Sequence, residues 1–498
     1  MSSMMPRVFA CVAAIVGAAL LPPFALAAAD GDAAAARAFA ACAAAGLAAA
    51  FAARPRRNSA APGARHGGDA PTAPNPADAI AAVGAAWIAV CLFGAAPLRL
   101  CGACRDVTDA VFESVSGFTT TGATVIADVE ALPRAVNLWR CETHWLGGMG
   151  VVALAVAFLP LLGVGGFRLM NAESTGPEKG KLTARVADTA RTLWLLYVSL
   201  TAAQVLLLRL CGMGWFDATC HAFSTLGTGG FSTRNASLAA FGNPAAEWVC
   251  TAFMLAAAVN FGVYHKFAAR RGAEALRSTE LRAFVALVAV AIVGATVALA
   301  RGGAGLVEAA RLAAFQVASI ISTTGFASAD YAVWVPGAQT VLLALFFVGG
   351  CSGSTAGGVK VVRWAVLAKQ AAVAARRFVH PRAVYVVRID GRPVRDGLVA
   401  AVAGFVAAYA ALVGATALAG AFAGLQAPEA FTAALSMAGN VGPAFGALGP
   451  SGNYGALPAA LKWWYCAAML AGRLEVFTML ALIGRMASAA RPKRGFRE

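Results

Sequence analysis

Charged residues are scarce in this chain. Asp, Glu, Lys and Arg make up 13% of its 498 residues, about half the share that soluble domains carry, whereas hydrophobic residues make up 59%. So few charges exclude a soluble globular protein, because most of the chain cannot face water. Apolar runs are present instead, several of them near the ~20 residues that a spanning helix needs. The runs are residues 8–26, 38–52, 79–98, 147–164, 192–210, 248–263, 281–300, 341–349, 398–423 and 463–484.

Groups of residues that carry enzyme or metal chemistry are missing as well. The histidines are too scattered to share a metal, and no nucleophile or paired-carboxylate site stands out, which argues against an enzyme. Cys101 and Cys104 form a single C-x-x-C pair, which without a second pair argues against zinc and leaves an optional disulfide open. The histidines are His66, His144, His221, His265 and His380.

The net charge of +16 could indicate a nucleic-acid partner, but the positions of the basic residues argue otherwise. They are concentrated in alternate loops, which the positive-inside rule places in the cytoplasm, where they suit anionic membrane lipid or an acidic partner. The first apolar run follows Arg7 and fits either a signal peptide or a retained spanning helix; the charge pattern agrees with the second. The basic loops contain Arg54, Arg56, Arg57 and Arg65; Arg168, Lys179, Lys181 and Arg185; Lys266, Arg270, Arg271 and Arg277; residues 360–395; and residues 485–497.

Four glycine-containing segments recur at intervals of about a hundred residues, in the loops that are poor in basic residues. Glycine permits backbone conformations that a Cβ forbids, so carbonyl oxygens can line a narrow pore and replace the water shell of an ion. The pattern predicts a selectivity filter whose four quarters lie on one polypeptide, in a potassium-conducting membrane protein. The segments are T-T-T-G-A-T at 119–124, L-G-T-G-G-F at 226–231, S-T-T-G-F at 322–326 and G-N-V-G-P at 439–443.

A short apolar segment precedes each glycine segment, and both lie between two longer runs. These short segments, residues 106–118, 217–225, 307–321 and 430–438, are predicted to be half-membrane pore helices whose carboxyl ends favour a cation. The predicted fold is an all-α polytopic membrane protein, with four helix–pore-loop–helix units in a pseudo-fourfold arrangement around one pore, plus two leading transmembrane helices. The predicted divisions are residues 1–77 (leading helices and basic loop), 78–164 (unit 1), 165–264 (cytoplasmic linker and unit 2), 265–367 (unit 3 with an intramembrane loop) and 368–498 (basic loop, unit 4 and cytoplasmic tail).

Longer strings around these segments carry a family resemblance. They are F-E-S-V-S-G-F at 112–118, W-L-G-G-M-G-V at 145–151, A-F-S-T at 222–225, G-F-S-T at 230–233, G-G-C-S-G-S-T-A-G-G-V-K at 349–360 and G-R-L-E-V-F-T at 472–478. Over nearly its whole length the chain resembles a TrkH-type subunit of the Trk/Ktr/HKT potassium-transporter superfamily.

The resemblance implies ten spanning helices in the bacterial inner membrane, with the filter facing the periplasm. It also implies a homodimer with one pore in each protomer, bound to a cytoplasmic ring of TrkA-like regulatory subunits. No cofactor is expected in this chain: K⁺ is the transported ion, and a nucleotide is expected on the regulatory partner.

The resemblance assigns the filter residue by residue. Gly122 stands where relatives that favour sodium carry serine, so potassium is favoured. Ala327 and Ala329 replace threonines usual in the family, and Gly439 replaces an asparagine, which leaves the ion selectivity open. The predicted filter glycines are Gly122, Gly229, Gly325 and Gly442, and the carbonyls are those of Thr120, Thr121, Gly227, Thr228, Thr323, Thr324, Asn440 and Val441.

Two inner features are predicted to form a gate. The glycine-rich run 349–358 interrupts an apolar segment, and each glycine disfavours a helix by ~1 kcal/mol relative to alanine. A phosphate-binding loop is excluded there, because Val361 rather than Ser or Thr follows Lys360. Arg473 lies in an apolar helix, where we favour a pore-facing barrier over an arginine that reaches the surface. The predicted gate residues are Gly350, Ser352, Gly353, Ser354, Gly357, Gly358, Lys360 and Arg473.

The leading hypothesis is gated, channel-like potassium uptake under the control of a cytoplasmic nucleotide-binding subunit. One alternative is a potassium carrier coupled to Na⁺ or H⁺ (a symporter), which would need a second ion site; another is a sodium-permeable relative. A membrane-embedded enzyme is the remote alternative.

Overall fold

The computed structural model describes residues 5–52, 76–162, 179–268, 270, 272–394, 396–480, 482 and 484. Several residues singled out above lie outside the described residues, among them the basic residues 54–65, Arg168, Arg271 and the tail 485–497. The described part is mostly helical, as predicted.

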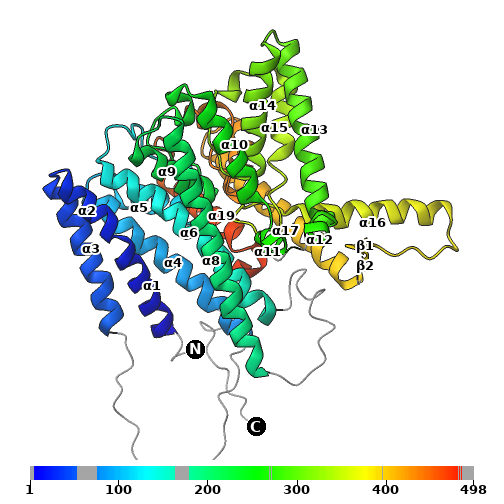
Figure 1. The fold of residues 1–498 in the computed structure, drawn as a ribbon, viewed down its shortest axis with the longest axis horizontal. Helices are drawn as coiled ribbons and strands as arrows, with labels where there is room; N and C mark the ends of the chain where they lie inside the picture. The colour runs from blue at the N-terminus through cyan, green and yellow to red at the C-terminus, as the bar shows by residue number, and fades with distance from the viewer. Residues whose placement is uncertain are drawn as a thin grey trace, which may run out of the picture.

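Three helices at the N-terminal side form a leading group. α1 (Met5–Ala19) and α2 (Leu21–Ala29) together make one apolar span over Phe9–Ala29, and α3 (Ala33–Ala52) returns beside them. The break between α1 and α2 precedes Pro22 and Pro23, which suit a first helical turn because their nitrogens need no intrahelical acceptor. The leading group lies at the left of Figure 1 and packs against the first unit.

Four units follow, each with an outer helix, a short pore helix and an inner helix. Unit 1 contains α4 (Pro76–Leu100), α5 (Val107–Phe118) and α6 (Arg134–Leu162). Unit 2 contains α8 (Lys179–Leu210), α9 (Trp215–Leu226), the 3-10 turn η1 (Ser237–Phe241), α10 (Pro244–Ala258) and α11 (Phe261–Ala268).

Unit 3 begins after the short α12 (Gly272–Leu276). It contains α13 (Thr279–Arg301), α14 (Leu306–Ile321), η2 (Tyr331–Val333), α15 (Pro336–Leu345) and α16 (Val361–Val379). A two-stranded hairpin, β1 (Arg388–Ile389) and β2 (Arg392–Pro393), leads to unit 4. In Figure 1 α16 extends away from the helical body, and the chain returns beneath it to the hairpin. Unit 4 contains α17 (Asp396–Phe422), α18 (Ala427–Gly439), η3 (Gly446–Leu448) and α19 (Ala459–Arg473).

The units meet in sequence order. The inner helix of one unit packs against the pore helix of the next: α6 against α9, α10 against α14, and α19 back against α5. Units 3 and 4 are joined by α16, which packs against α17. The last unit thus closes on the first, as the predicted pseudo-fourfold arrangement requires.

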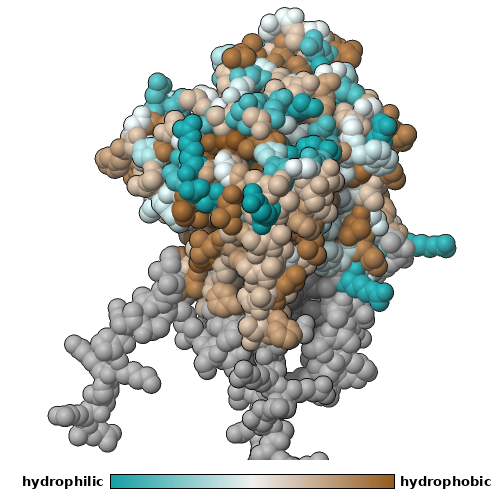
Figure 2. All heavy atoms as spheres, turned by 90° about the vertical axis from the view of Figure 1, so that its left-hand side faces the viewer, coloured by the Kyte–Doolittle hydropathy of each residue, from teal (hydrophilic) through white to brown (hydrophobic). Residues whose placement is uncertain are grey.

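Six described segments are long and apolar enough to cross a membrane, or seven if the bent pair α10–α11 counts as one. Figure 2 shows apolar side chains over much of the described flank on the side of the leading helices, with hydrophilic residues gathered toward one end. Of the inner helices, α15 and α19 have 10 and 15 residues, too few to span alone. The count of ten spans stays a prediction.

Besides the run 8–26, broken between α1 and α2, and the run 341–349, whose helix ends at Leu345, two other predicted runs are not continuous helices. The run 248–263 bends by 95° between α10 and α11, where Asn260 caps the new turn by accepting from Gly262 N at 2.7 Å. The run 463–484 breaks after Arg473, where Glu475 has a positive φ of 63°. Both breaks lie near the interrupted helix of unit 3, so irregular backbone from three units gathers in one place.

Candidate ion-selective site

Each pore helix ends in the same backbone conformation. Just beyond the end of each helix, a residue adopts the left-handed backbone region, and a glycine two positions later adopts it as well. A residue with an ordinary side chain is disfavoured in this region by about 1–2 kcal/mol. Such a pair repeated four times is the structural counterpart of the four predicted loops. The pairs are Thr120 (φ 53°) and Gly122 (80°), Thr228 (55°) and Gly230 (82°), Thr323 (56°) and Gly325 (78°), and Asn440 (56°) and Gly442 (99°).

The residue between the two left-handed positions is tied to its own pore helix. In every unit its N–H donates to the carbonyl of a serine five residues earlier, at 2.8–3.0 Å. The serine recurs in all four pore helices, a sequence signal that fixes the alignment of the loops. The bonds are Thr121 to Ser116, Gly229 to Ser224, Thr324 to Ser319 and Val441 to Ser436.

The four loops contact one another in a closed ring. A Cβ placed on any of the four left-handed glycines would overlap the carbonyl oxygen of the next loop, so each carbonyl lies against a neighbouring glycine. The fourth loop contacts the first, which completes the cycle. The contacts are Gly122 with Gly229 O, Gly230 with Thr324 O, Gly325 with Val441 O, and Gly442 with Thr121 O.

The second loop differs from the prediction by one residue. Gly230, not Gly229, has the positive φ and the close approach to the next carbonyl, whereas Gly229 occupies the carbonyl-bearing position. The glycine-phenylalanine pairs Gly230-Phe231 and Gly325-Phe326 could have given this alignment from sequence. Gly227 and Thr228 are displaced with it: Thr228 is the first left-handed residue of the loop, and Gly227 caps the carboxyl end of α9. The residues predicted in the other three loops lie at equivalent positions.

A buried ion pair supports the first loop. Arg140 Nε donates to Glu113 Oε1 at 2.8 Å, with both side chains excluded from solvent. Glu113 also accepts from Val125 N at 3.0 Å, just beyond the loop, and Arg140 Nη1 reaches Ser232 O of unit 2 at 3.3 Å. A charge pair in a low-dielectric interior is tolerated only when it is fully hydrogen-bonded, as this one is.

Acidic residues occupy the third position of every pore helix, where the helix dipole favours a negative charge. One of them takes part in an ion pair between helices: Lys462 Nζ donates to Asp109 at 2.6 Å and joins unit 4 to unit 1. A comparable contact, Arg311 with Glu247 of α10, joins unit 3 to unit 2. The four acidic residues are Asp109, Asp217, Glu308 and Glu429.

The predicted interruption of unit 3 is present as an irregular segment between α15 and α16, residues 346–360, called here the intramembrane loop. Gly357 N donates to Thr323 Oγ1 at 2.7 Å, and Gly357 also packs against Asn440, so the loop touches the left-handed residues of two filter loops. On its other side, Cys351 N donates to Ala258 O at 2.8 Å, at the bend of unit 2.

Arg473 connects this loop to two inner helices. It is 6% exposed and lies at the end of α19. Its Nη1 donates to Thr355 O in the loop at 2.7 Å, and its Nη2 donates to Gly147 O of α6 at 3.2 Å. Arg473 does not pair with Glu475, its near neighbour in sequence, because Glu475 pairs with Arg363 at 2.6 Å. The guanidinium of Arg473 instead joins the intramembrane loop to α6 beneath the ring.

Ser352 of the intramembrane loop is held from the α13 side, by a contact that the sequence did not predict. Glu280, buried in the first turn of α13, accepts from Ser352 N at 2.5 Å. Next to it, Thr279 N donates to Asp390 Oδ1 at 2.6 Å, at the tip of the β1–β2 hairpin. Asp390 and Gly391 both have positive φ, as a two-residue hairpin turn requires. The ammonium group of Lys360 donates a hydrogen bond to Ala356 O within the loop.

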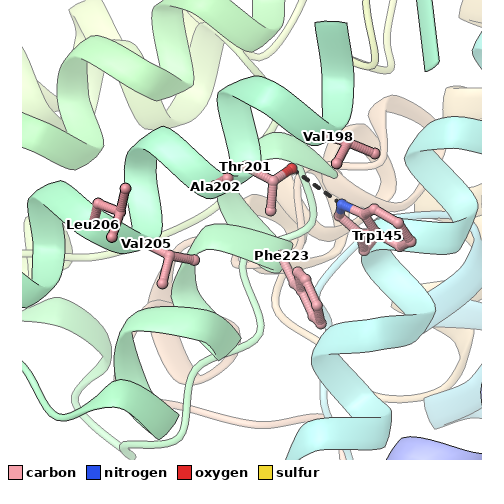
Figure 3. A pocket seen from close by; sticks show the side chains of 7 residues that line it. All are labelled: Trp145, Val198, Thr201, Ala202, Val205, Leu206 and Phe223. Atoms are coloured by element: carbon pink, nitrogen blue, oxygen red, sulfur yellow. Dashed lines mark hydrogen bonds between the residues drawn. The ribbon is translucent and has the colours of Figure 1, made fainter. Parts of the chain in front are cut away.

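One apolar hollow in the surface lies apart from the ring. It measures about 360 Å³ between α6, α8 and α9, and Figure 3 shows the Trp145 indole directed at Thr201, to which it donates at 3.1 Å. No group of three or more His, Cys, Asp or Glu side chains that could hold a metal occurs within the described ranges. Cys101 and Cys104 are free thiols.

These features define an integral membrane protein of four related units that meet at a ring of backbone carbonyls. A family model described as a cation transport protein, TrkH, matches residues 59–490. The Trk system potassium uptake protein TrkH of Halomonas elongata is 43% identical over 401 residues, which cover 80% of this chain and 83% of that protein. The counterpart from Escherichia coli K12 is 40% identical over 380 residues, covering 76% and 78%.

The solved structures agree with this. The crystal structure of the potassium transporter TrkH from Vibrio parahaemolyticus superimposes with a TM-score of 0.84 at 33% identity, covering 97% of this chain and 98% of that one. The chain belongs to the TrkH family of cation transport proteins, which confirms the resemblance seen in the sequence. Its relatives are transporters, so the enzyme alternative is dropped.

Proposed function

We propose that this protein takes up potassium through a channel-like pore whose selectivity filter is the ring of four loops. The closed cycle of glycine–carbonyl contacts supports this most directly, because it holds four carbonyls in one ring where they can replace the water shell of an ion. The relatives described above are named for potassium uptake. The carbonyls proposed to bind K⁺ include those of Thr121, Gly229, Thr324 and Val441.

The intramembrane loop and Arg473 are the proposed gate. The loop lies against Thr323 and Asn440, and the guanidinium of Arg473 bridges it to α6. A positive charge in a low-dielectric path repels a cation strongly. Closing the path there would stop flux without altering the filter itself.

The surroundings of this site are proposed from the charge pattern and the family. The filter faces the periplasm of a bacterial inner membrane, and the basic α16 with its hairpin faces the cytoplasm. That surface would meet a nucleotide-binding, TrkA-like regulatory subunit, and two copies of the chain would pair as a homodimer. The five sequence divisions and their boundaries belong to this proposal.

Growth and ion flux test the proposal. The chain would be expressed in a bacterium that lacks potassium uptake, and growth at limiting potassium and rubidium influx would be followed. We expect rescue with saturable rubidium entry. Two results would contradict the proposal: sodium entry without rubidium entry, or no rescue of growth when a cognate regulatory subunit is co-expressed and membrane expression is confirmed.

Purified protein then separates a pore from a carrier. Reconstituted into a planar bilayer, a pore gives single-channel currents whose reversal potential follows the potassium gradient. Flux that requires Na⁺ or H⁺ on the same side and gives no unitary currents would establish the coupled carrier instead.

A further inference from the structure

The second filter loop lacks a side chain where the other three have one. The carbonyl-bearing positions hold Thr121, Thr324 and Val441 in units 1, 3 and 4, and Gly229 in unit 2. All four make the same backbone bond to the pore-helix serine. Glycine has the widest backbone freedom of any residue, so Gly229 needs support from elsewhere if its carbonyl is to stay in the ring.

A histidine from the preceding unit fills the space left by this missing side chain. A Cβ on Gly229 would overlap Cγ, Nδ1 and Cδ2 of His144, which means that the imidazole lies directly against this glycine. His144 belongs to α6 and is fully buried. The imidazole of His144 therefore packs against the second loop, in the place where a side chain on Gly229 would lie.

The imidazole also holds the segment after the glycine pair. His144 Nδ1 accepts from Phe231 N at 3.3 Å, and the two rings stack with centroids 4.1 Å apart at 17°. Arg140, one turn earlier on α6, covers the same phenylalanine with its guanidinium at 4.2 Å from the ring centroid. His144 thus touches the loop before and after Gly230, and fixes the direction of the Gly229 carbonyl toward Gly122.

We propose that His144 is a positioning residue that sets the ion selectivity of the second quarter of the filter. This inference rests on the proposed function, because selectivity has meaning only if the ring conducts. The imidazole, which comes from α6 of the same chain, takes the place of the side chain that Gly229 lacks. Without it the Gly229 carbonyl gains freedom and adapts to the smaller sodium ion, so discrimination against sodium decreases.

A set of substitutions tests whether the imidazole and the glycine share one space. We would measure K⁺/Na⁺ permeability ratios from reversal potentials of purified full-length protein in bilayers. His144→Ala should lower the ratio several-fold, and Gly229→Ala should lower it as well, because its new methyl group meets the imidazole. The double variant His144→Ala/Gly229→Ala should recover much of the loss, since the methyl group then occupies the vacated space. His144→Gln, which keeps an acceptor for Phe231 N, should stay close to the unsubstituted protein.

His221 supplies the matched control. It is the other fully buried histidine of this region, and it bonds Asp217 O and Ser232 Oγ rather than Gly229. His221→Ala combined with Gly229→Ala should show no recovery. Thermal unfolding and gel filtration identify variants that do not fold; if His144→Ala is among them, the Gln and Gly229→Ala variants decide.

The outcomes are distinct. An unchanged ratio in folded His144→Ala, or a double variant no better than the worse single one, would overturn the role of His144. Unsubstituted protein without potassium selectivity would instead overturn the proposed function. Recovery confined to the His144 pair would support the proposal.

Discussion

Glycine is favoured in the ring of four loops for two separable reasons, its backbone conformation and the closeness of its neighbour. Gly122 and Gly102 have similar φ values of 80° and 74°, but only at Gly122 would a Cβ overlap a carbonyl, that of Gly229; around Gly102 there is nothing within 4 Å. We expect Gly122→Ser to weaken discrimination against sodium, because the side chain displaces a carbonyl of the ring. Reversal potentials under mixed K⁺ and Na⁺ gradients measure this.

Gly102→Ser is the control for the backbone alone. It should lower the free energy of unfolding by about 1–2 kcal/mol and leave the permeability ratio unchanged. Equal effects of the two substitutions on selectivity would show that backbone strain, not contact with the ring, limits the filter.

The buried pair Arg140–Glu113 should be a major contributor to stability. Arg140→Ala leaves the Glu113 carboxylate buried and unpaired, which we expect to cost about 3–5 kcal/mol of unfolding free energy. Arg134→Ala removes an ion pair to Asp30 that is largely exposed, and should cost about 0–1 kcal/mol. Thermal unfolding in detergent compares the two; similar losses would mean that Arg140 is solvated in the protein.

At the residue scale the sequence indicated most of the residues in the ring of four loops, but not the contacts that support the ring. The second left-handed position of each loop follows from its glycine, which adopts this region readily. The first is occupied by a β-branched threonine in three of the loops, which sequence reasoning would not place there. Two adjacent glycines left the second loop ambiguous by one residue. Contacts such as His144 with Gly229 join residues 85 positions apart, and no local pattern reports them.

At the scale of elements, a carboxylate of α13, that of Glu280, is one of the groups that hold the intramembrane loop. Glu280→Gln replaces a charge-assisted hydrogen bond to Ser352 N by a neutral one and should weaken the hold on the loop by about 1–2 kcal/mol, or about five- to thirty-fold in its equilibrium. If the loop is the gate, thallium flux without a regulatory subunit should rise.

Glu308→Gln provides the comparison for this change. Glu308 lies in the first turn of α14 with a 63% exposed side chain, and its nearest basic group is 4.0 Å away. It should not change basal flux. A rise of equal size in both variants, or none in folded Glu280→Gln, would exclude Glu280 as a restraint on the loop.

Arg473 tests the same gate from the opposite side. Arg473→Ala removes a positive charge from beneath the ring and the bridge between Thr355 and Gly147, so flux without the regulatory subunit should increase several-fold. Arg473→Lys keeps the charge and should remain closer to the unsubstituted protein. Unchanged flux in a well-folded alanine variant would contradict the barrier role.

The pore helices were predicted from sequence to within about three residues at each end. Residues 307–321 correspond to Leu306–Ile321, and 430–438 to Ala427–Gly439. Glycine content also predicted the break in unit 3. The bends after Ala258 and Arg473 were not predicted, because their backbone groups are satisfied by other units: Ala258 O accepts from Cys351 N of the intramembrane loop.

At the scale of the whole molecule, the charge pattern predicts which ends face which compartment. His380 follows α16, and Ser451 follows η3 in unit 4; both are exposed. In a background without the accessible thiols of Cys11, Cys101 and Cys211, an impermeant maleimide applied outside spheroplasts should label Ser451→Cys and not His380→Cys. Labelling in the opposite order would invert the proposed orientation.

The architecture as a whole was the most predictable part, because the repetition of short and long apolar runs does not depend on any single residue. The inter-unit ion pairs were not predictable. Lys462 and Asp109 are 353 positions apart, and each alone is typical of a solvent-facing helix end.

The contacts around the ring run in one direction, from each glycine to the carbonyl of the unit that follows it in the chain. The four quarters are therefore coupled in series, in addition to the hydrogen bond that ties each loop to its own pore helix. A substitution in one unit should first deform the ion ligand contributed by the next unit, so the damage and the altered residue will lie in different repeats. When selectivity is gained or lost in evolution, we therefore expect paired substitutions in consecutive repeats. The second substitution would restore the ion ligand that the first displaced.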